Sequence, residues 1–114
     1  MKIYHNPRCS KSRQALALLR EAGCEPEIVL YLETPPSTLE LAALLEKLSM
    51  SARALLRKGE AEYKALGLDN PDLDEQTLLR AMSAHPKLIE RPVVVSGSRA
   101  VLGRPPENVR KLLQ

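Results

Sequence analysis

The chain has 114 residues, 44% of them hydrophobic and 27% charged, which excludes a disordered chain and favours one compact domain. Its formal net charge of +3 suits an anionic small molecule and is too small and too scattered to indicate nucleic-acid binding. With no Trp, no Phe and only three Tyr, the core is expected to consist of aliphatic residues and methionine.

The first elements in chain order are a strand, a helix and a second strand. Lys2–His5 carries apolar residues before an Asn-Pro break and predicts a short strand. Apolar positions then recur at helical spacing, which predicts a helix over residues 10–22, with Gly23 as its C-terminal stop. Pro26–Leu32 is apolar and β-rich and predicts the second strand. Elements this close together make a βαβ unit, so the two strands should be parallel.

The middle stretch, approximately residues 35–90, predicts helices and no convincing strand. Ser37 is a candidate N-cap with Glu40 three residues on, the pattern of a capping box, and a helical face follows it. Three more helices are expected over Ala52–Arg57, Glu60–Leu66 and Asp74–Ala84. We therefore expect this stretch to be a helical insertion.

The β-rich pattern returns after the insertion. Pro92–Ser96 and Arg99–Leu102 predict two strands joined by a Gly-Ser turn, which makes a hairpin. A last helix is expected to include Val109 and Leu112, with prolines near its first turn. The whole order predicts a single α/β domain over residues 1–114, with a mixed four-stranded sheet flanked by helices and the insertion between the second and third strands.

The motif YHNPRCSKSR places Cys9 at the junction between the first strand and the first helix. A helix N-terminus presents unpaired N–H groups and partial positive charge, which lower the pKa of a thiol and bind anions. Arg8, Lys11 and Arg13 add positive charge around it. We therefore interpret Cys9 as an activated nucleophile rather than as a small buried hydrophobe, the usual role of a lone cysteine.

The second cysteine of a C-x-x-C dithiol is replaced here by Ser12, so Cys9 has no local partner to resolve a mixed disulfide. Cys24 follows the far end of the predicted helix, about 20 Å away at 1.5 Å per residue, and is expected to be a partly buried spectator. The cysteine spacing matches no zinc pattern. The sequence lacks a signal-peptide pattern and any run of the roughly 18 apolar residues that a membrane span needs, so we expect a cytoplasmic protein with free thiols.

Candidate oxyanion ligands are the three residues Arg57, Arg91 and Arg104. Arg91 directly precedes the third strand and Arg104 follows the end of the fourth, and α/β proteins place their sites at sheet ends. The planar guanidinium suits bidentate oxyanion binding. From pattern alone, gathering all three in one site would be a guess, because single arginines usually lie at the solvated surface.

Together, YHNPRCSKSR, RALLRKGE and RPVVVSGSRAVLGRPPE resemble the glutaredoxin-dependent arsenate reductase family, in the family's order and over nearly the whole chain. The resemblance implies a thioredoxin-like fold with a helical insertion and a cis peptide between Arg91 and Pro92. It implies that Cys9 attacks arsenate. It assigns the oxyanion ligands to Arg57, Arg91 and Arg104, and activation of the thiol to His5 and Ser12.

The resemblance also implies the other participants. Glutathione would be the co-substrate, a glutaredoxin would reduce the resulting glutathione–Cys9 disulfide, and no metal, nucleotide or flavin would be bound. For His5 the sequence leaves two roles open, an imidazolium that stabilises the thiolate or a solvent-facing residue at a strand end. We expect a monomer that binds neither nucleic acid nor membranes.

Two other functions stay open beside the reductase. One is a glutathione-linked thiol oxidoreductase with a different electrophile. The other is a non-enzymatic regulator of the Spx type, which shares the layout and typically uses a C-x-x-C switch. Because Ser12 replaces the second cysteine and all three arginines are present, the enzyme is favoured over the regulator.

Overall fold

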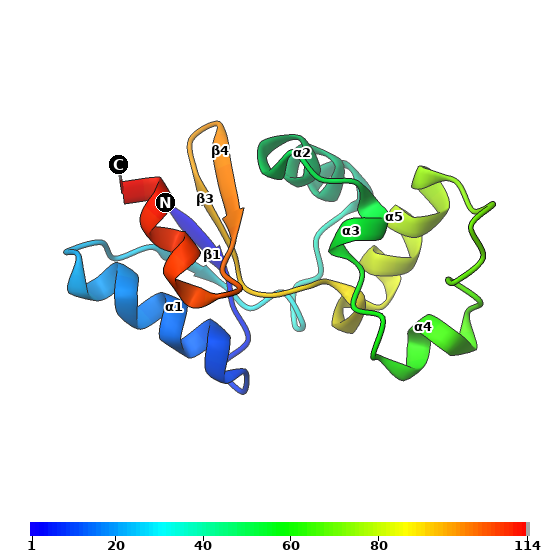
Figure 1. Cartoon of the computed structure of the whole chain (residues 1–114), viewed down its shortest axis with the longest axis horizontal. Helices are drawn as coiled ribbons and strands as arrows, with labels where there is room; N and C mark the ends of the chain where they lie inside the picture. The colour runs from blue at the N-terminus through cyan, green and yellow to red at the C-terminus, as the bar shows by residue number, and fades with distance from the viewer. Residues whose placement is uncertain (114) are drawn as a thin grey trace. The chain divides into compact units, whose positions relative to one another are not determined.

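The computed structural model describes residues 1–113, which divide into two compact units (Figure 1). The sheet unit comprises Met1–Thr34 and the segment from Arg91 onward, and the helical unit comprises Pro35–Glu90. The helical unit coincides with the predicted insertion, while the single domain over the whole chain stays a prediction. Within the described residues no helix is both long and apolar enough to cross a membrane.

All four strands belong to the sheet unit and form one sheet in the order β2-β1-β3-β4. β1 pairs in parallel with β2 and antiparallel with β3, and β3 pairs antiparallel with β4. The predicted βαβ unit, hairpin and mixed sheet are therefore confirmed. The strands are β1 (Lys2–Tyr4), β2 (Glu27–Val29), β3 (Val93–Ser96) and β4 (Arg99–Leu102).

Two helical elements, α1 (Ser10–Glu21) and η2 (Pro106–Leu113), lie side by side and pack on the sheet (Figure 1). Their apolar positions meet the cross-strand pair Ile3 and Val94 in one buried cluster. The cluster comprises Ile3, Ala15, Leu16, Leu19, Val94, Val109 and Leu112. The first helix stops where predicted, since Gly23 has a φ of +84°, a conformation that glycine adopts without steric cost.

Two predicted elements of the sheet unit differ in the structure. The second strand covers Glu27–Val29 instead of extending to Leu32, because the carbonyl of Leu30 accepts hydrogen bonds from the N–H groups of Glu33 and Thr34 at 2.9 and 3.0 Å. A turn therefore ends the strand before the apolar run is complete. The last helix is a 3₁₀ helix over Pro106–Leu113.

The helical unit consists of α2 (Thr38–Leu48), α3 (Ala52–Leu55), α4 (Ala61–Ala65), α5 (Glu75–Ala84) and the 3₁₀ turn η1 (Pro86–Leu88). The predicted N-caps are confirmed: the Ser37 hydroxyl accepts from the N–H of Glu40 at 3.1 Å, and the Asp74 carboxylate accepts from the N–H of Thr77 at 2.8 Å. α5 contacts α2, α3 and η1 and so forms the centre of the unit.

The helix α3 ends at Leu55, and Leu56 and Arg57 do not continue it, which corrects the predicted helix over Ala52–Arg57. Leu56 has extended dihedral angles and forms an isolated antiparallel bridge with Ile89. The N–H of Arg57 donates to the carbonyl of Leu88 at 2.8 Å, and the N–H of Glu90 donates to the carbonyl of Leu55 at 2.9 Å. Two segments far apart in sequence thus join, which local periodicity cannot reveal.

The start of β3 and the end of β4 are held together closely. The predicted cis peptide Arg91–Pro92 is confirmed, and a second, Arg104–Pro105, was not predicted. The N–H of Gly103 donates to the carbonyl of Pro92 at 2.8 Å, and a Cβ added at Gly103 would lie 2.8 Å from the Cγ of Pro92. Only a residue without a side chain fits this approach.

We therefore expect Gly103→Ala to lower the free energy of unfolding by about 1–3 kcal/mol, the usual cost of overpacking a tight contact. Chemical denaturation measures the change. Gly59→Ala is the matched control, because nothing lies within 4 Å of a Cβ added there. Equal stability of the two variants would contradict the close packing of Gly103 on Pro92.

Candidate active site

The loop between β1 and α1 holds Cys9 at the N-cap of the helix, as predicted. Asn6 orders this loop: its side-chain oxygen accepts from the N–H of Arg8 at 3.0 Å, and its carbonyl accepts from the N–H of Cys9 at 3.0 Å. Sequence reasoning did not assign Asn6 a role, although an Asn-Pro pair is a known turn signal. No acidic residue lies in the first turn of α1, so nothing there repels an anion.

The thiol of Cys9 is free and partly exposed. Burial raises the pKa of the Cys9 thiol. The backbone N–H of Ser12, the Arg91 guanidinium and the backbone N–H of Lys11 together lower it by more, so the pKa lies below the ordinary value of a cysteine. Arg91 acts both as a hydrogen-bond donor to the sulfur and as a positive charge. The predicted nucleophile and one predicted oxyanion ligand are therefore in contact.

His5 and Ser12 form a buried pair beside this loop. His5 Nδ1 lies 2.6 Å from the Ser12 hydroxyl oxygen, which also accepts from the N–H of Asn6 at 3.1 Å. The side chain of His5 is buried, so the solvent-facing role is wrong. Burial, followed by the charges of Arg20 and Arg13, lowers the pKa of His5, which favours the neutral imidazole at neutral pH over the imidazolium. The geometry fits a neutral His5 that orients Ser12.

Arg91 and Arg104 meet at the end of the β3–β4 hairpin. The Nη1 of Arg104 donates to the carbonyl of Arg91 at 3.3 Å. Asn108 holds the turn, since its Nδ2 donates to the carbonyls of Leu102 and Arg104 at 3.2 and 3.1 Å. No sequence pattern predicted that Asn108 would form these two hydrogen bonds. The sheet unit thus brings together, through successive contacts, the predicted site residues His5, Cys9, Ser12, Arg91 and Arg104.

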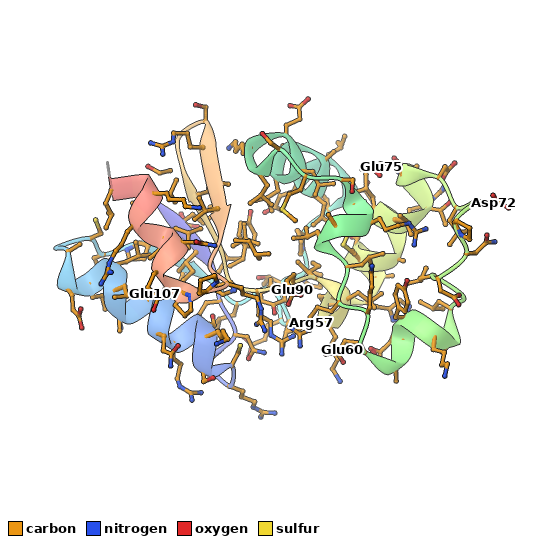
Figure 2. All side chains as sticks on the ribbon, in the orientation of Figure 1. Arg57, Glu60, Asp72, Glu75, Glu90 and Glu107 are labelled. Atoms are coloured by element: carbon orange, nitrogen blue, oxygen red, sulfur yellow. The ribbon has the colours of Figure 1, made fainter. Side chains whose placement is uncertain are left out.

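Arg57 belongs to the helical unit, where it lies between two carboxylates (Figure 2). Its Nη1 is 2.5 Å from Glu90 Oε1, and its Nε is 3.4 Å from Glu60 Oε1. All three side chains are partly buried, each with 23–28% of its side-chain surface exposed. The predicted participation of Arg57 in an oxyanion site stays a prediction. Sequence reasoning missed both carboxylate partners. Glu90 approaches Arg57 through the Leu56–Ile89 bridge, which no local pattern reveals.

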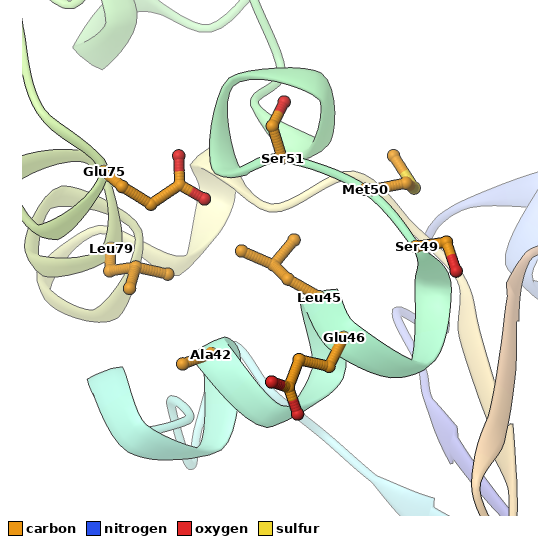
Figure 3. A pocket seen from close by; sticks show the side chains of 8 residues that line it. All are labelled: Ala42, Leu45, Glu46, Ser49, Met50, Ser51, Glu75 and Leu79. Atoms are coloured by element: carbon orange, nitrogen blue, oxygen red, sulfur yellow. The ribbon is translucent and has the colours of Figure 1, made fainter.

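A hollow of about 520 Å³ lies in the helical unit and is lined by α2, α5 and the residues before α3 (Figure 3). Its lining is divided equally between apolar residues and serine or glutamate residues, and contains no cysteine or histidine. The Glu75 carboxylate, which points into it, already accepts from the N–H of Ala52 at 2.9 Å at the start of α3. This hollow therefore offers no thiol or imidazole, and Cys9 remains the candidate nucleophile.

In the Cys24→Ser protein, we expect the Cys9 thiol to titrate clearly below the roughly 8.5 of a free cysteine. Since the thiolate is the reactive form, its absorbance and its alkylation rate should rise with pH and level off at a lower pH than for a free thiol. Arg91→Gln should move this profile to higher pH, whereas Arg110→Gln, an exposed change, should not. A profile that matches free cysteine would contradict the activated thiol.

Comparison with known proteins gives consistent matches over nearly the whole chain. The profile of the ArsC family matches residues 4–112. An arsenate reductase of Neisseria meningitidis is 53% identical over 114 residues, which cover 99% of this chain and 97% of that protein.

Two solved structures match in fold as well as in sequence. A putative arsenate reductase from Yersinia pestis has a TM-score of 0.93 at 54% identity and covers 96% of this chain and 97% of its own. An arsenate reductase from Vibrio cholerae has a TM-score of 0.94 at 49% identity, with 97% of each chain covered. These matches confirm the predicted thioredoxin-like fold.

Proposed function

Since the chain belongs to the ArsC family, we propose that it reduces arsenate to arsenite in the cytoplasm with Cys9 as nucleophile. The observation that carries this proposal is the contact between Cys9, at the N-terminus of α1, and the Arg91 guanidinium. Helix N–H groups and a guanidinium are the donors that a tetrahedral oxyanion needs. The name arsenate reductase of close relatives identifies which oxyanion to test first.

The first step is attack of the Cys9 thiolate on arsenic. An S–As bond forms, and one arsenate oxygen takes up a proton and leaves as water or hydroxide. Arg91 and Arg104 hold the remaining oxygens as their negative charge shifts, and the neutral His5 orients Ser12 beside the thiolate. No metal ion or bound cofactor enters this step.

The second step transfers two electrons to arsenic. The thiolate of glutathione attacks the Cys9–arsenic adduct, an S–S bond forms, and the electron pair of the S–As bond stays with arsenic. Arsenic passes from As(V) to As(III) and leaves as arsenite, and Cys9 is left in a mixed disulfide with glutathione. A glutaredoxin then restores the Cys9 thiol by disulfide exchange.

An external thiol is proposed because Cys24 is poorly placed to act. Cys24 follows the far end of α1, partly buried against the core cluster of the sheet unit. A helix of 12 residues is about 18 Å long. We therefore expect Cys24→Ser to keep arsenate turnover within a few-fold of the wild type. A loss comparable to that of Cys9→Ser would make Cys24 the resolving thiol.

The proposed function is tested by a coupled assay that follows NADPH oxidation with glutathione, glutathione reductase and glutaredoxin. We expect oxidation that depends on arsenate and on every other component. Oxidation that proceeds equally without arsenate would instead favour a thiol oxidoreductase with another electrophile. If no oxyanion supports turnover, the proposal that this protein is a reductase of oxyanions is wrong.

A further inference from the structure

A pocket of about 300 Å³ lies in the sheet unit beside the Cys9 loop. One wall is the loop that follows β1, and the other is the segment that follows β2. These strands are adjacent and parallel, and ligands in α/β proteins bind in the crevice outside the carboxyl ends of such strands. The volume lies at the lower end of the range for small-molecule sites. The position and size of the pocket therefore suit a small ligand.

The lining combines apolar residues, the polar residues His5 and Asn6, and one charge of each sign. Pro7, Leu30 and Leu32 supply apolar surface, and Arg8 and Glu33 supply the charges. Both charged residues are exposed, and within residues 1–113 neither side chain forms a hydrogen bond or ion pair. A carboxylate in the pocket would repel an inorganic oxyanion. A small zwitterion, with a carboxylate for Arg8 and an ammonium for Glu33, matches the lining.

The pocket and the nucleophile share one loop. Arg8 directly precedes Cys9, and the N–H of Cys9 donates to the carbonyl of Asn6, another lining residue, at 3.0 Å. A short peptide bound between Arg8 and Glu33 would therefore lie directly beside the loop that carries the nucleophile.

We propose that this pocket binds the thiol co-substrate as a zwitterionic tripeptide of the glutathione class, with a carboxylate on Arg8 and the α-ammonium group near Glu33. This assignment rests on the proposed function, in which such a thiol resolves the Cys9 adduct. It adds the recognition of the peptide by charges at both ends, in a pocket distinct from the guanidinium groups that hold the oxyanion.

The test uses a reaction that needs no arsenate, so that its failure is distinguishable from failure of the reductase. In the Cys24→Ser protein, the Cys9 thiolate attacks oxidised glutathione, forms the Cys9–glutathione disulfide and releases one glutathione thiolate. Intact-mass spectrometry measures the rate. Bis(2-hydroxyethyl) disulfide, which lacks both charged groups, measures the intrinsic reactivity of Cys9 in the same variants.

We expect Arg8→Gln and Glu33→Gln each to slow the reaction with oxidised glutathione by about two- to tenfold. The rate with the neutral disulfide should be unaffected, because the groups that lower the pKa of Cys9 in the structure are Arg91 and two backbone N–H groups. The direction of the rate change in Glu33→Gln is decisive. Oxidised glutathione is a net anion, so if only overall charge attracted it, removal of the Glu33 carboxylate would make the reaction faster. The exposed changes Glu27→Gln and Arg110→Gln are the matched controls.

Three results would overturn the proposal. They are a faster reaction of Glu33→Gln, an equal slowing of both disulfides, and a wild-type protein that shows no preference for oxidised glutathione over the neutral disulfide. If arsenate turnover is present, the same two variants should raise the KM for glutathione and leave the KM for arsenate unchanged.

Discussion

Cys9→Ser is expected to reduce arsenate turnover to the background rate, a loss of about four to six orders of magnitude as for other removed nucleophiles. A serine hydroxyl at this position stays protonated near neutral pH, because an alcohol is a far weaker acid than a thiol and the contacts that lower the pKa of Cys9 cannot offset that difference. The coupled assay measures the loss.

Folding controls accompany this variant. Cys9 is only partly buried, and serine is a favoured residue at a helix N-cap, so Cys9→Ser should unfold at no lower denaturant concentration than the wild type. Cys24→Ser, the same substitution at the other cysteine, is the matched control for activity. Measurable arsenate-dependent turnover in pure Cys9→Ser protein would show that another group attacks arsenic.

The second large effect is expected at the arginines. Arg91→Lys and Arg104→Lys should each reduce oxyanion binding or turnover, because an ammonium group cannot reproduce the planar fork of donors. The loss of one charge-assisted contact costs about 1.5–3 kcal/mol, or roughly 10- to 150-fold. Arg80→Lys, at an exposed position of α5, is the matched control and should change neither quantity. Full turnover in both variants would contradict an oxyanion site at these residues.

Arg57→Lys tests the remaining arginine of the predicted trio. If Arg57 binds the oxyanion, this variant should show a loss in the same range. Because Arg57 also pairs with Glu60 and Glu90, we expect a change in stability that Arg91→Lys does not share. Loss of stability with unchanged oxyanion affinity would make Arg57 a structural residue of the helical unit.

Signals that reside in a few consecutive residues predicted much of the fold. Ser37 and Asp74 cap helices where the pattern placed them, and Gly23 ends α1 in a left-handed conformation. The alternation in the last two strands predicted the hairpin. These features depend on local hydrogen bonds and backbone conformations, which neighbouring residues determine.

Two features escaped the sequence, a turn inside an apolar run and a pairing of two distant segments. The apolar run after Pro26 suggested a long strand, but the carbonyl of Leu30 accepts two turn hydrogen bonds instead. Leu56 leaves the helix to pair with Ile89, and this bridge brings Glu90 to Arg57. No periodicity reports such a pairing, because it joins residues 33 positions apart.

The candidate site likewise contains residues that local sequence predicted and residues whose roles required the structure. Cys9 was identified from its place at a helix N-terminus, and the contact with Arg91 agrees with that interpretation. The role of His5 required burial to be known, since a buried imidazole with a lowered pKa stays neutral. The pocket between Arg8 and Glu33 could not be predicted, because it forms only where the ends of two parallel strands meet.

The central claim is that Cys9 attacks arsenate and is then resolved by glutathione. Its most direct test is intact-mass and peptide mass spectrometry of Cys24→Ser protein after incubation with arsenate and reduced glutathione, without glutaredoxin. We expect one glutathione per chain, attached to Cys9, in an amount equal to the arsenite released. Omission of arsenate should leave Cys9 as a thiol. Arsenite release with Cys9 unmodified, or glutathione attachment independent of arsenate, would contradict the account.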